Sequence, residues 1–484
     1  MSRLLLGLVV AVAGASVVAA CSAQRASDSS GGASTEVDAG DAGFPEIVLA
    51  PETQRSGDPA KGYHALVNEP IVPCGIPMTA YSTVFGPAPE SDRVEGREGA
   101  NATLSYRFTA MTTKEGVALA TSNCLVCHAG RINGQLVVGL GDADGDYTSD
   151  VAAQSRLSSG VGLLLNTAEE RAEWQKWKAR MDVAAPFSVL STRGPNPADD
   201  FTLALFAHHD PKTMAWSDKP LVALPEPEDL PVDVPPWWRM KKKSSMFYNG
   251  AGRGDHARIM MTASILCTSS VEESRAIDAL FPDIRAYIMS IVPPAYPYAV
   301  DQALAGRGHA VFDSTCSRCH GTYGDAPTYP NRLVTLAEIG TDPVLASGSA
   351  EFETRFTDWY NGSFFGEMSR LEPQAGYLAP PLDGIWATAP FLHNGSVPTI
   401  EALLDSSKRP TYFTRSFDSK DYDARALGWK FTALSKGKDQ TTNVAAKKAL
   451  YDTTLRGYGN AGHTFGDVLT PDDRAAVLEY LKTL

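Results

Sequence analysis

Apolar residues recur at helical spacing in five stretches of the chain, and strict alternation of apolar and polar residues is weak throughout. Positions three or four residues apart share one face of a helix, whereas a strand alternates with a period of two. The helical stretches are 151–182, 256–270, 272–291, 301–314 and 471–484. We therefore predict a mainly α fold with little β structure.

The stretch 471–484 has the clearest helix start. Thr470 offers the hydroxyl of an N-cap, Pro471 suits the first helical position, and Asp473 lies in the first turn. Two long stretches rich in proline and glycine separate the helical ones, and we expect irregular structure there. These stretches are 183–240 and 321–400.

The N-terminus has the pattern of an export signal. Arg3 precedes an apolar run over 4–20, and small residues lead directly to Cys21. The run is short for a membrane-spanning helix, so we predict cleavage before Cys21 and lipidation of its thiol, with an uncleaved anchor as the alternative. Residues 22–44 are small and polar and are expected to form a flexible tether. We expect an exported, lipid-anchored protein in the periplasm, at the outer membrane or on the cell surface.

Length and charge narrow the class of protein further. The residues after the tether, about 440, are enough for two domains. The net charge of −13 and the pI near 5.2 argue against a nucleic-acid partner. The composition is that of a globular protein, and no second apolar stretch is long enough to span a membrane.

Two copies of Cys-x-x-Cys-His are the most informative motifs. They are Cys124-Leu125-Val126-Cys127-His128 and Cys316-Ser317-Arg318-Cys319-His320. The two thiols of each copy can bond to the two vinyl groups of one haem, and the histidine then lies under the iron as its proximal ligand. A zinc site would need four ligands close together, and a thiol-redox pair does not require the histidine. The chain therefore predicts two covalently bound c-type haems.

The wide spacing of the motifs predicts one haem in each of two domains. We place the first haem domain at 51–294 and the second at 295–484, after a signal peptide at 1–20 and the lipidated tether at 21–50. The segment 305–312 reads as the helix that leads a cytochrome c domain to its haem. We expect the haems to replace part of an ordinary apolar core.

Two cysteines are left over. Cys21 goes to lipid and four cysteines go to haem, which leaves Cys74 and Cys267. They can pair in an oxidising compartment, but the sequence does not decide whether they meet.

The ligand on the far side of each iron separates an electron carrier from an enzyme. A haem with two strong protein ligands passes electrons, whereas a haem with an open position can bind oxygen or peroxide. For the second haem the candidates are Met368, His393 and His463, and spacing does not choose among them.

The loop 380–395 reads Pro-Pro-Leu-Asp-Gly-Ile-Trp-Ala-Thr-Ala-Pro-Phe-Leu-His-Asn-Gly. It resembles the bacterial dihaem cytochrome c peroxidase superfamily, and the whole pattern is most similar to the branch that contains the dihaem rubber oxygenases. Further matching segments are Pro73–Pro77, Pro235–Trp238, Lys241–Lys243, Met246–Tyr248, Gly252–His256 and Gly462-His463.

The resemblance implies a role for each candidate ligand of the second haem. In the peroxidases the loop histidine is not an iron ligand and a later methionine is, but no methionine follows Met368. In the rubber oxygenase branch a late histidine binds the second haem, and His463 matches it. We therefore predict His320 and His463 as its ligands and place His393 beside them without contact to the iron.

For the first haem the resemblance implies an open side shielded by an aromatic residue. Phe247 matches that position, although an ordinary core role is the alternative. His256 is the competing candidate, because a distal histidine would assist peroxide cleavage, and a propionate-binding role also fits it. Trp237 and Trp238 could line a substrate pocket or carry electrons, or pack against a porphyrin.

The resemblance implies O2 or H2O2 as the small reactant and an apolar small molecule or polymer as the substrate. The peroxidase alternative would instead draw electrons from a redox partner protein, and a purely electron-carrying cytochrome is the third alternative. The rubber oxygenases are longer and are released to act on bulk polymer, whereas Cys21 predicts a membrane anchor.

Two charged segments are weaker signals. Arg239 and Lys241–Lys243 could pair with haem propionates or form a solvated face. An acidic segment superficially resembles a calcium loop, but Ala153 stands where an EF-hand has its closing glutamate. Its residues are Asp142, Asp144, Asp146 and Asp150. Calcium held in another geometry stays open.

Overall fold

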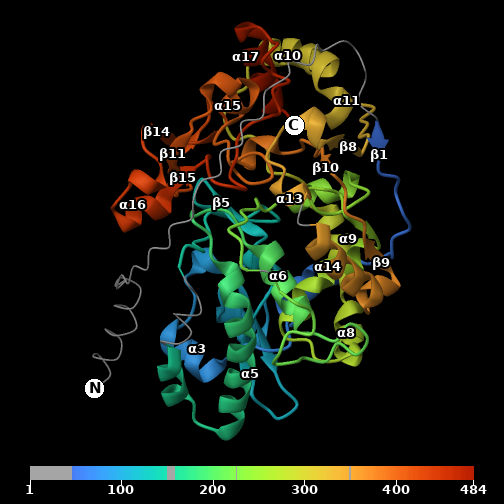
Figure 1. Ribbon diagram of the computed structural model, residues 1–484, viewed down its shortest axis with the longest axis vertical. Coiled ribbons are helices and arrows are strands. Elements are labelled where there is room, and N and C mark those ends of the chain that lie inside the picture. The colour runs from blue at the N-terminus through green and yellow to red at the C-terminus, as the bar shows by residue number, and fades with distance from the viewer. Residues whose placement is uncertain (1–45, 150–157, 225, 348–349) are drawn as a thin grey trace. The chain divides into compact units, whose positions relative to one another are not determined.

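The chain forms helices and many short strands (Figure 1). The computed structural model describes residues 46–149, 158–224, 226–347 and 350–484. In these segments the strands form six small sheets of two or three strands each. The prediction of a mainly α fold with little β structure is therefore confirmed only in part, because the fold is mixed and not clearly mainly α. The strands are two to five residues long, too short to show alternation in the sequence.

The first half of the chain carries helices α2 to α9, with short 3₁₀ helices between them. The α-helices are α2 Pro59–Asn68, α3 Met78–Val84, α5 Ala168–Ala184, α6 Ala198–Ala207, α7 His256–Met260, α8 Val271–Asp278 and α9 Phe281–Ser290. These 3₁₀ helices include η3 Cys124–Val126, η4 Ser158–Leu164, η6 Trp237–Lys242 and η7 Met261–Leu266. Its strands are β1 Ile47–Val48, β2 Ile76–Pro77, β3 Phe108–Thr112, β4 Ala118–Ser122, β5 Ala129–Ile132, β6 Gln135–Val138 and β7 Gly252–Gly254.

The second half carries α10 to α17. The helices are α10 Gln302–Thr315, α11 Ser317–His320, α12 Leu336–Ile339, α13 Val344–Ser347, α14 Ala350–Gly362, α15 Ile400–Leu404, α16 Val444–Ala449 and α17 Pro471–Leu481. The strands are β8 Arg332–Thr335, β9 Ser369–Leu371, β10 Gly376–Leu378, β11 Tyr412–Arg415, β12 Tyr422–Asp423, β13 Gly428–Trp429, β14 Phe431–Leu434 and β15 Leu450–Asp452.

Two of the predicted helices are confirmed almost to the residue. The stretch 301–314 forms α10, and 471–484 forms α17, whose N-cap Thr470 accepts a hydrogen bond from the Asp473 backbone N–H. Both begin with a side-chain cap, which starts the helix at a defined residue.

Three predicted helices are broken. The stretch 272–291 divides into α8 and α9, because Pro282 has no N–H to continue a helix and instead starts a new one. The stretch 256–270 tightens after one turn from α7 into η7. In 151–182 the helix α5 begins only after Thr167, and residues 150–157 lie outside the described segments.

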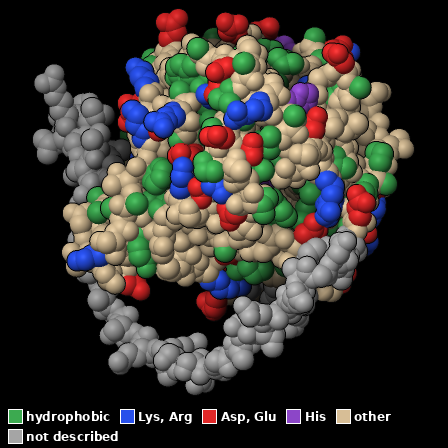
Figure 2. Space-filling model, turned by 90° about the horizontal axis from the view of Figure 1, so that it is seen from above, with side chains coloured by type: hydrophobic (Ala, Val, Ile, Leu, Met, Phe, Trp, Pro, Cys, Tyr) green, Lys and Arg blue, Asp and Glu red, His purple; other side chains and the backbone are tan. Residues whose placement is uncertain are grey.

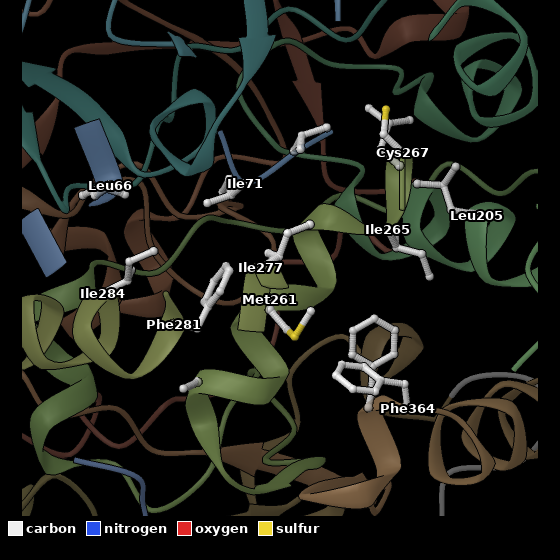
Figure 3. Packing of buried hydrophobic residues seen from close by; sticks show 14 of the residues in the cluster. Leu66, Ile71, Leu205, Met261, Ile265, Cys267, Ile277, Phe281, Ile284 and Phe364 are labelled. Atoms are coloured by element: carbon white, nitrogen blue, oxygen red, sulfur yellow. The ribbon is translucent and has the colours of Figure 1, made fainter. Parts of the chain in front are cut away.

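A first apolar cluster fills the space between α2, α6, α7 and α9 (Figure 3). Figure 3 shows Met261, Phe281 and Ile284 among the side chains of this cluster. The disulfide between Cys74 and Cys267 lies in this cluster, with Cα atoms 5.5 Å apart and both residues fully buried. The pairing that the sequence left open is therefore present.

A second apolar cluster lies around α10 and α17, which pack against each other along their length (Figure 1). A Cβ at Gly308 would overlap the Ala476 carbonyl, so the close crossing of these two helices requires glycine. Trp238 and Trp386 belong to this cluster.

Residues Glu46–Leu484 form one compact unit. Each apolar cluster draws residues from both sides of position 294, where the sequence predicts a domain boundary. Trp359 and Phe364 join the first cluster, and Ile132 and Leu140 join the second. Charged and apolar side chains are interspersed on the face in Figure 2.

None of the helices in the described segments combines the length and the apolar character that a membrane crossing requires. The predicted signal peptide, the tether up to residue 44 and Cys21 lie outside the described residues.

Candidate haem centres

The second Cys-x-x-Cys-His motif follows α10 directly and forms the short helix α11. The ring of His320 is oriented by a hydrogen bond of 2.8 Å between its Nδ1 and the Pro380 carbonyl oxygen. A carbonyl only accepts, so Nδ1 carries the proton and the Nε2 lone pair of the neutral ring is left for a metal. Such a partner on the other nitrogen is what fixes the tautomer of a metal-binding histidine.

His463 faces His320 across the second motif. The two imidazole centroids are 6.2 Å apart and the ring planes differ by 57°. Two metal–nitrogen bonds of about 2 Å, plus half of each ring, give a separation of about 6 Å. The pair therefore fits one iron between the two rings.

The backbone holds His463 firmly in this position. Its N–H donates to the Ile339 carbonyl over 2.7 Å, and its own carbonyl accepts from Arg409 over 3.0 Å. The φ of +44° at His463 lies in the left-handed region, and the preceding Gly462 also has positive φ. A side chain in such an unusual turn is oriented by the fold, not by local helix propensity.

The electrostatics of this pair favour neutral rings. Burial lowers the pKa of His463 to about 3, and His320 and Arg409 add to that shift. Burial also lowers the pKa of His320. The Nδ1 of His463 is buried without a hydrogen-bond partner. Neutral imidazole is the form that binds a metal.

The other two candidate ligands point elsewhere. The sulfur of Met368 accepts a hydrogen bond from Arg258 over 3.3 Å. His393 stacks on Tyr377 with ring centroids 4.2 Å apart, and its Nε2 lies 3.1 Å from the Tyr377 hydroxyl. Burial lowers the pKa of His393 to about 3. Of the three candidates, the described contacts bring His463 alone against the His320 ring.

The first motif begins with η3, which Asn123 caps by accepting from the Leu125 N–H over 2.9 Å. His128 follows at the start of the β5–β6 hairpin, and the Gly139 N–H donates to its carbonyl. Its ring stacks on Trp237 with centroids 4.8 Å apart and planes 24° apart.

Burial lowers the pKa of His128 to about 4, opposed by the nearby Pro235 carbonyl. Its Nδ1 is buried and makes no hydrogen bond of ordinary geometry. A proline carbonyl thus lies beside the histidine of each motif, Pro235 at the first and Pro380 at the second. Each belongs to a Pro-Pro pair, so the sequence itself carries this repeated signal.

The four motif cysteines form no disulfide bond. Burial raises the pKa of Cys124 and of Cys316 to about 12. The second thiol of each motif accepts a hydrogen bond from a residue distant in sequence. Asn196 donates to Cys127 over 3.3 Å, and Arg332 donates to Cys319 over 3.1 Å. Neither donor could be recognised from the sequence pattern.

The short helix η6 connects the two motifs. Trp237 lies on His128, and the next residue, Trp238, is fully buried in the second cluster, where its Nε1 donates to the Asp383 carbonyl over 2.8 Å. Arg239 donates to the Thr388 hydroxyl over 2.9 Å, and its charge helps to lower the pKa of His320. Consecutive residues of η6 therefore lie against His128 of the first motif and against the 380–395 loop.

Phe247 and His256 occupy different environments. Phe247 is 42% exposed in a tight turn with φ of +68°. His256 is 2% exposed and begins α7, capped by Asp255. Burial lowers the pKa of His256 to about 4, and Arg285 and Lys243 add to that shift.

The acidic segment is balanced by arginines. Asp142 lies 3.8 Å from Arg107, and Asp144 lies 3.4 Å from Arg415. Asp146 accepts from the Thr148 N–H and hydroxyl. In the part of the chain that the structure describes, no group of three or more His, Cys, Asp or Glu could hold a metal ion. Asp150 and Ala153 lie outside it.

Residues 376–414 match a family model described as RoxA-like, cytochrome c-like. Two proteins of Sinorhizobium fredii (strain NBRC 101917 / NGR234) are similar. Uncharacterized protein y4iJ is 31% identical over 40% of this chain and 41% of its own length. Uncharacterized protein y4iM is 28% identical over 48% of this chain and 56% of its own length. The chain thus spans roughly half the length of these relatives.

The matched segment contains Pro380, His393 and the loop that joins them, and so it covers the carbonyl that orients His320. This match supports a RoxA-related cytochrome c domain. It points to c-type haem and to haem-based oxidoreductase chemistry.

Proposed function

We propose that this protein is an exported dihaem c-type oxidoreductase whose two haems differ in ligation. The observation that carries the proposal is the facing pair of His320 and His463, for which the first motif has no equivalent. There the ring against His128 is that of Trp237, and no second imidazole contacts His128 within the described residues. One haem would have two histidine ligands and the other would keep an open side.

Different residues of the chain would hold each haem. The first haem would be bound to Cys124 and Cys127 with His128 as proximal ligand. The second would be bound to Cys316 and Cys319 between the His320 and His463 rings. A haem with an open position supplies activation of O2 or H2O2 when it is bound. Trp237 holds the His128 ring, and Phe247 would shield the open side.

We favour an oxygenase acting on an apolar unsaturated substrate. The second haem site offers a histidine where the peroxidases use a methionine, and Met368 is engaged by Arg258 instead. A small pocket beside the first motif is a candidate entry for substrate. It is lined by Leu140, Gly141, Asp233, Val234, Pro236 and Thr388, among others. The alternative function is a dihaem peroxidase that receives electrons from a redox partner protein. For the oxygenase, the alternative substrate is a polymer instead of a small molecule.

We place the protein outside the cytoplasm, held at a membrane by lipid on Cys21. Covalent haem attachment takes place there, and the Cys74–Cys267 disulfide belongs to an oxidising compartment. The N-terminal apolar run agrees with export.

Spectroscopy of the haem-loaded protein tests the proposal. We expect two haems per chain, one low-spin and insensitive to cyanide and one that is high-spin or binds O2. Two low-spin haems that both ignore cyanide would instead make the protein an electron carrier.

Substrate assays then separate the two enzymes. Uptake of O2 with polyisoprene or an unsaturated lipid supports the oxygenase. Consumption of H2O2 with a reduced cytochrome as electron donor, and no O2 uptake, would replace it by the peroxidase.

A further inference from the structure

Two cationic side chains and a buried histidine lie together at the end of η6, the helix whose first residue, Trp237, stacks on His128. Lys243 is the C-cap residue of η6, His256 is the first residue of α7, and Arg285 lies in α9. The helix α9 packs against both η6 and α7, which brings the three residues together. Arg285 and Lys243 are the charged groups with the largest effect on His256.

These side chains have unused hydrogen-bonding groups. Neither ring nitrogen of His256 makes a hydrogen bond of ordinary geometry, although the Ser244 carbonyl is near. The Nε of Arg285 is also buried without an acceptor. Each buried donor of this kind normally has a partner, and an orphaned one needs an explanation.

The charge of the group is also unbalanced. Asp255 is the acid that acts on both His256 and Arg285, but it is already paired with Arg55 over 2.9 Å. In the described segments no carboxylate forms an ion pair with Lys243 or Arg285. Burial, together with Arg239, lowers the pKa of Lys243 to about 8. Buried charges are stable when they are paired, so this group is suited to an anionic ligand.

The position of the group relates it to the first haem. Ala257 follows His256, and Ile284 precedes Arg285. Both belong to the first apolar cluster, together with Leu125 of the motif and Trp237. Trp237 opens η6 at the His128 ring, and Lys243 ends the same helix. The two carboxylates of a haem held at His128 would need donors, and this group offers donors that the protein itself leaves unpaired.

We propose that Lys243, His256 and Arg285 form a cradle for the propionate carboxylates of the haem held at His128. Lys243 and Arg285 supply charged donors, and His256 supplies a neutral N–H. This inference rests on the proposed haem at the first motif. It also assigns His256 to the edge of that haem instead of to its iron.

The test measures haem content and the redox potential of each haem separately in the full-length haem-loaded protein. We expect Lys243→Gln and Arg285→Gln to retain both haems but to move the first haem to a more negative potential. A lost cation near the propionates favours the oxidised, more positive iron. Lys243→Arg should restore the original potential.

Lys241→Gln is the matched control, because it removes the same charge from an exposed neighbour. It should leave both potentials unchanged. Unchanged first-haem potentials in Lys243→Gln and Arg285→Gln, or a shift confined to the second haem, would overturn the cradle.

A substrate carboxylate is the other source of the same chemistry. Oleate added to the wild-type protein distinguishes it. If oleate alters the first-haem spectrum with an affinity that drops in Lys243→Gln, while the potentials without oleate stay equal, the group binds substrate and not propionate. Failure of the proposed function looks different, since the wild-type protein would then carry no haem on Cys124 and Cys127.

Discussion

Trp237 lies almost flat against the imidazole of His128, with ring centroids 4.8 Å apart. The indole is 5% exposed and packs within the first apolar cluster, so its position against the histidine ring is fixed. An aromatic pair of this kind contributes about 1 kcal/mol beyond its buried area. Its larger effect is to fix the rotation of a ring that would bind iron.

Replacing Trp237 by Leu is expected to destabilise the protein by about 3 kcal/mol and to broaden the electron paramagnetic resonance signal of the first haem. The stability is measured by denaturant unfolding. Trp238→Leu is the control, since Trp238 is equally buried but contacts the second cluster. It should cost similar stability and leave the first-haem signal sharp. An unchanged first-haem signal in Trp237→Leu would show that the stacking does not orient His128.

Removing the imidazole of His463 should open the second haem. In His463→Ala the covalent bonds to Cys316 and Cys319 would keep the haem, while the spin state changes from low to high and cyanide begins to bind. Added imidazole should restore the low-spin spectrum. His309→Ala, at a partly exposed histidine of α10, is expected to change nothing. A low-spin second haem in His463→Ala would mean that another residue is the ligand.

Phe247→His tests the shield of the open side. The turn already holds φ at +68°, a conformation that histidine adopts more readily than most residues, so the backbone should not change. If Phe247 faces the first iron, the new imidazole makes that haem low-spin and lowers turnover at least about tenfold. Phe85→His, at another exposed phenylalanine, is the control. Full activity and an unchanged spectrum in Phe247→His would remove Phe247 from the site.

The Cys74–Cys267 disulfide is expected to stabilise the fold strongly, because it joins residues 193 apart in the sequence. Replacing both cysteines by serine should lower the free energy of unfolding by about 2–5 kcal/mol. Alkylation of the denatured, unreduced protein should detect neither thiol in the wild type. Labelling of both without reductant would contradict the pairing.

The carboxyl group of Asp233 is expected to make the free energy of unfolding depend on pH. Burial raises its pKa from 3.8 to about 7, although Tyr248 donates to its carboxylate over 3.1 Å. Between about pH 4 and pH 7 the folded protein then holds a proton that the unfolded chain has lost, so this residue makes stability fall as pH rises.

Asp233→Asn should remove that slope, a difference of about 2 kcal/mol across the window after allowance for the partial exposure of Asp233. The quantity to measure is the free energy of unfolding of variant and wild type from pH 4 to pH 8. Asp325→Asn, at an exposed aspartate, should follow the wild type. Parallel curves for Asp233→Asn and wild type would mean that Asp233 is ionised throughout.

Local signals in the sequence predicted the local features well. The helices α10 and α17, each of which begins with a side-chain cap, form where the pattern placed them, because a cap and an apolar face act within one element. The short strands were missed, since a strand such as β8 is held by partners far away in the chain, β1 and β10. The break at Pro282 could have been foreseen from the proline alone.

The sequence by itself determined the chemistry of the two motifs, because Cys-x-x-Cys-His places its thiols and its imidazole within one short turn. The resemblance pointed to His463, but only the tertiary structure decided that its ring lies against His320 while Met368 contacts Arg258 and His393 stacks on Tyr377. It also decided that Cys74 meets Cys267 and that Trp237 covers His128. Contacts between residues more than a hundred positions apart depend on how the whole chain packs, and spacing along the sequence does not encode them.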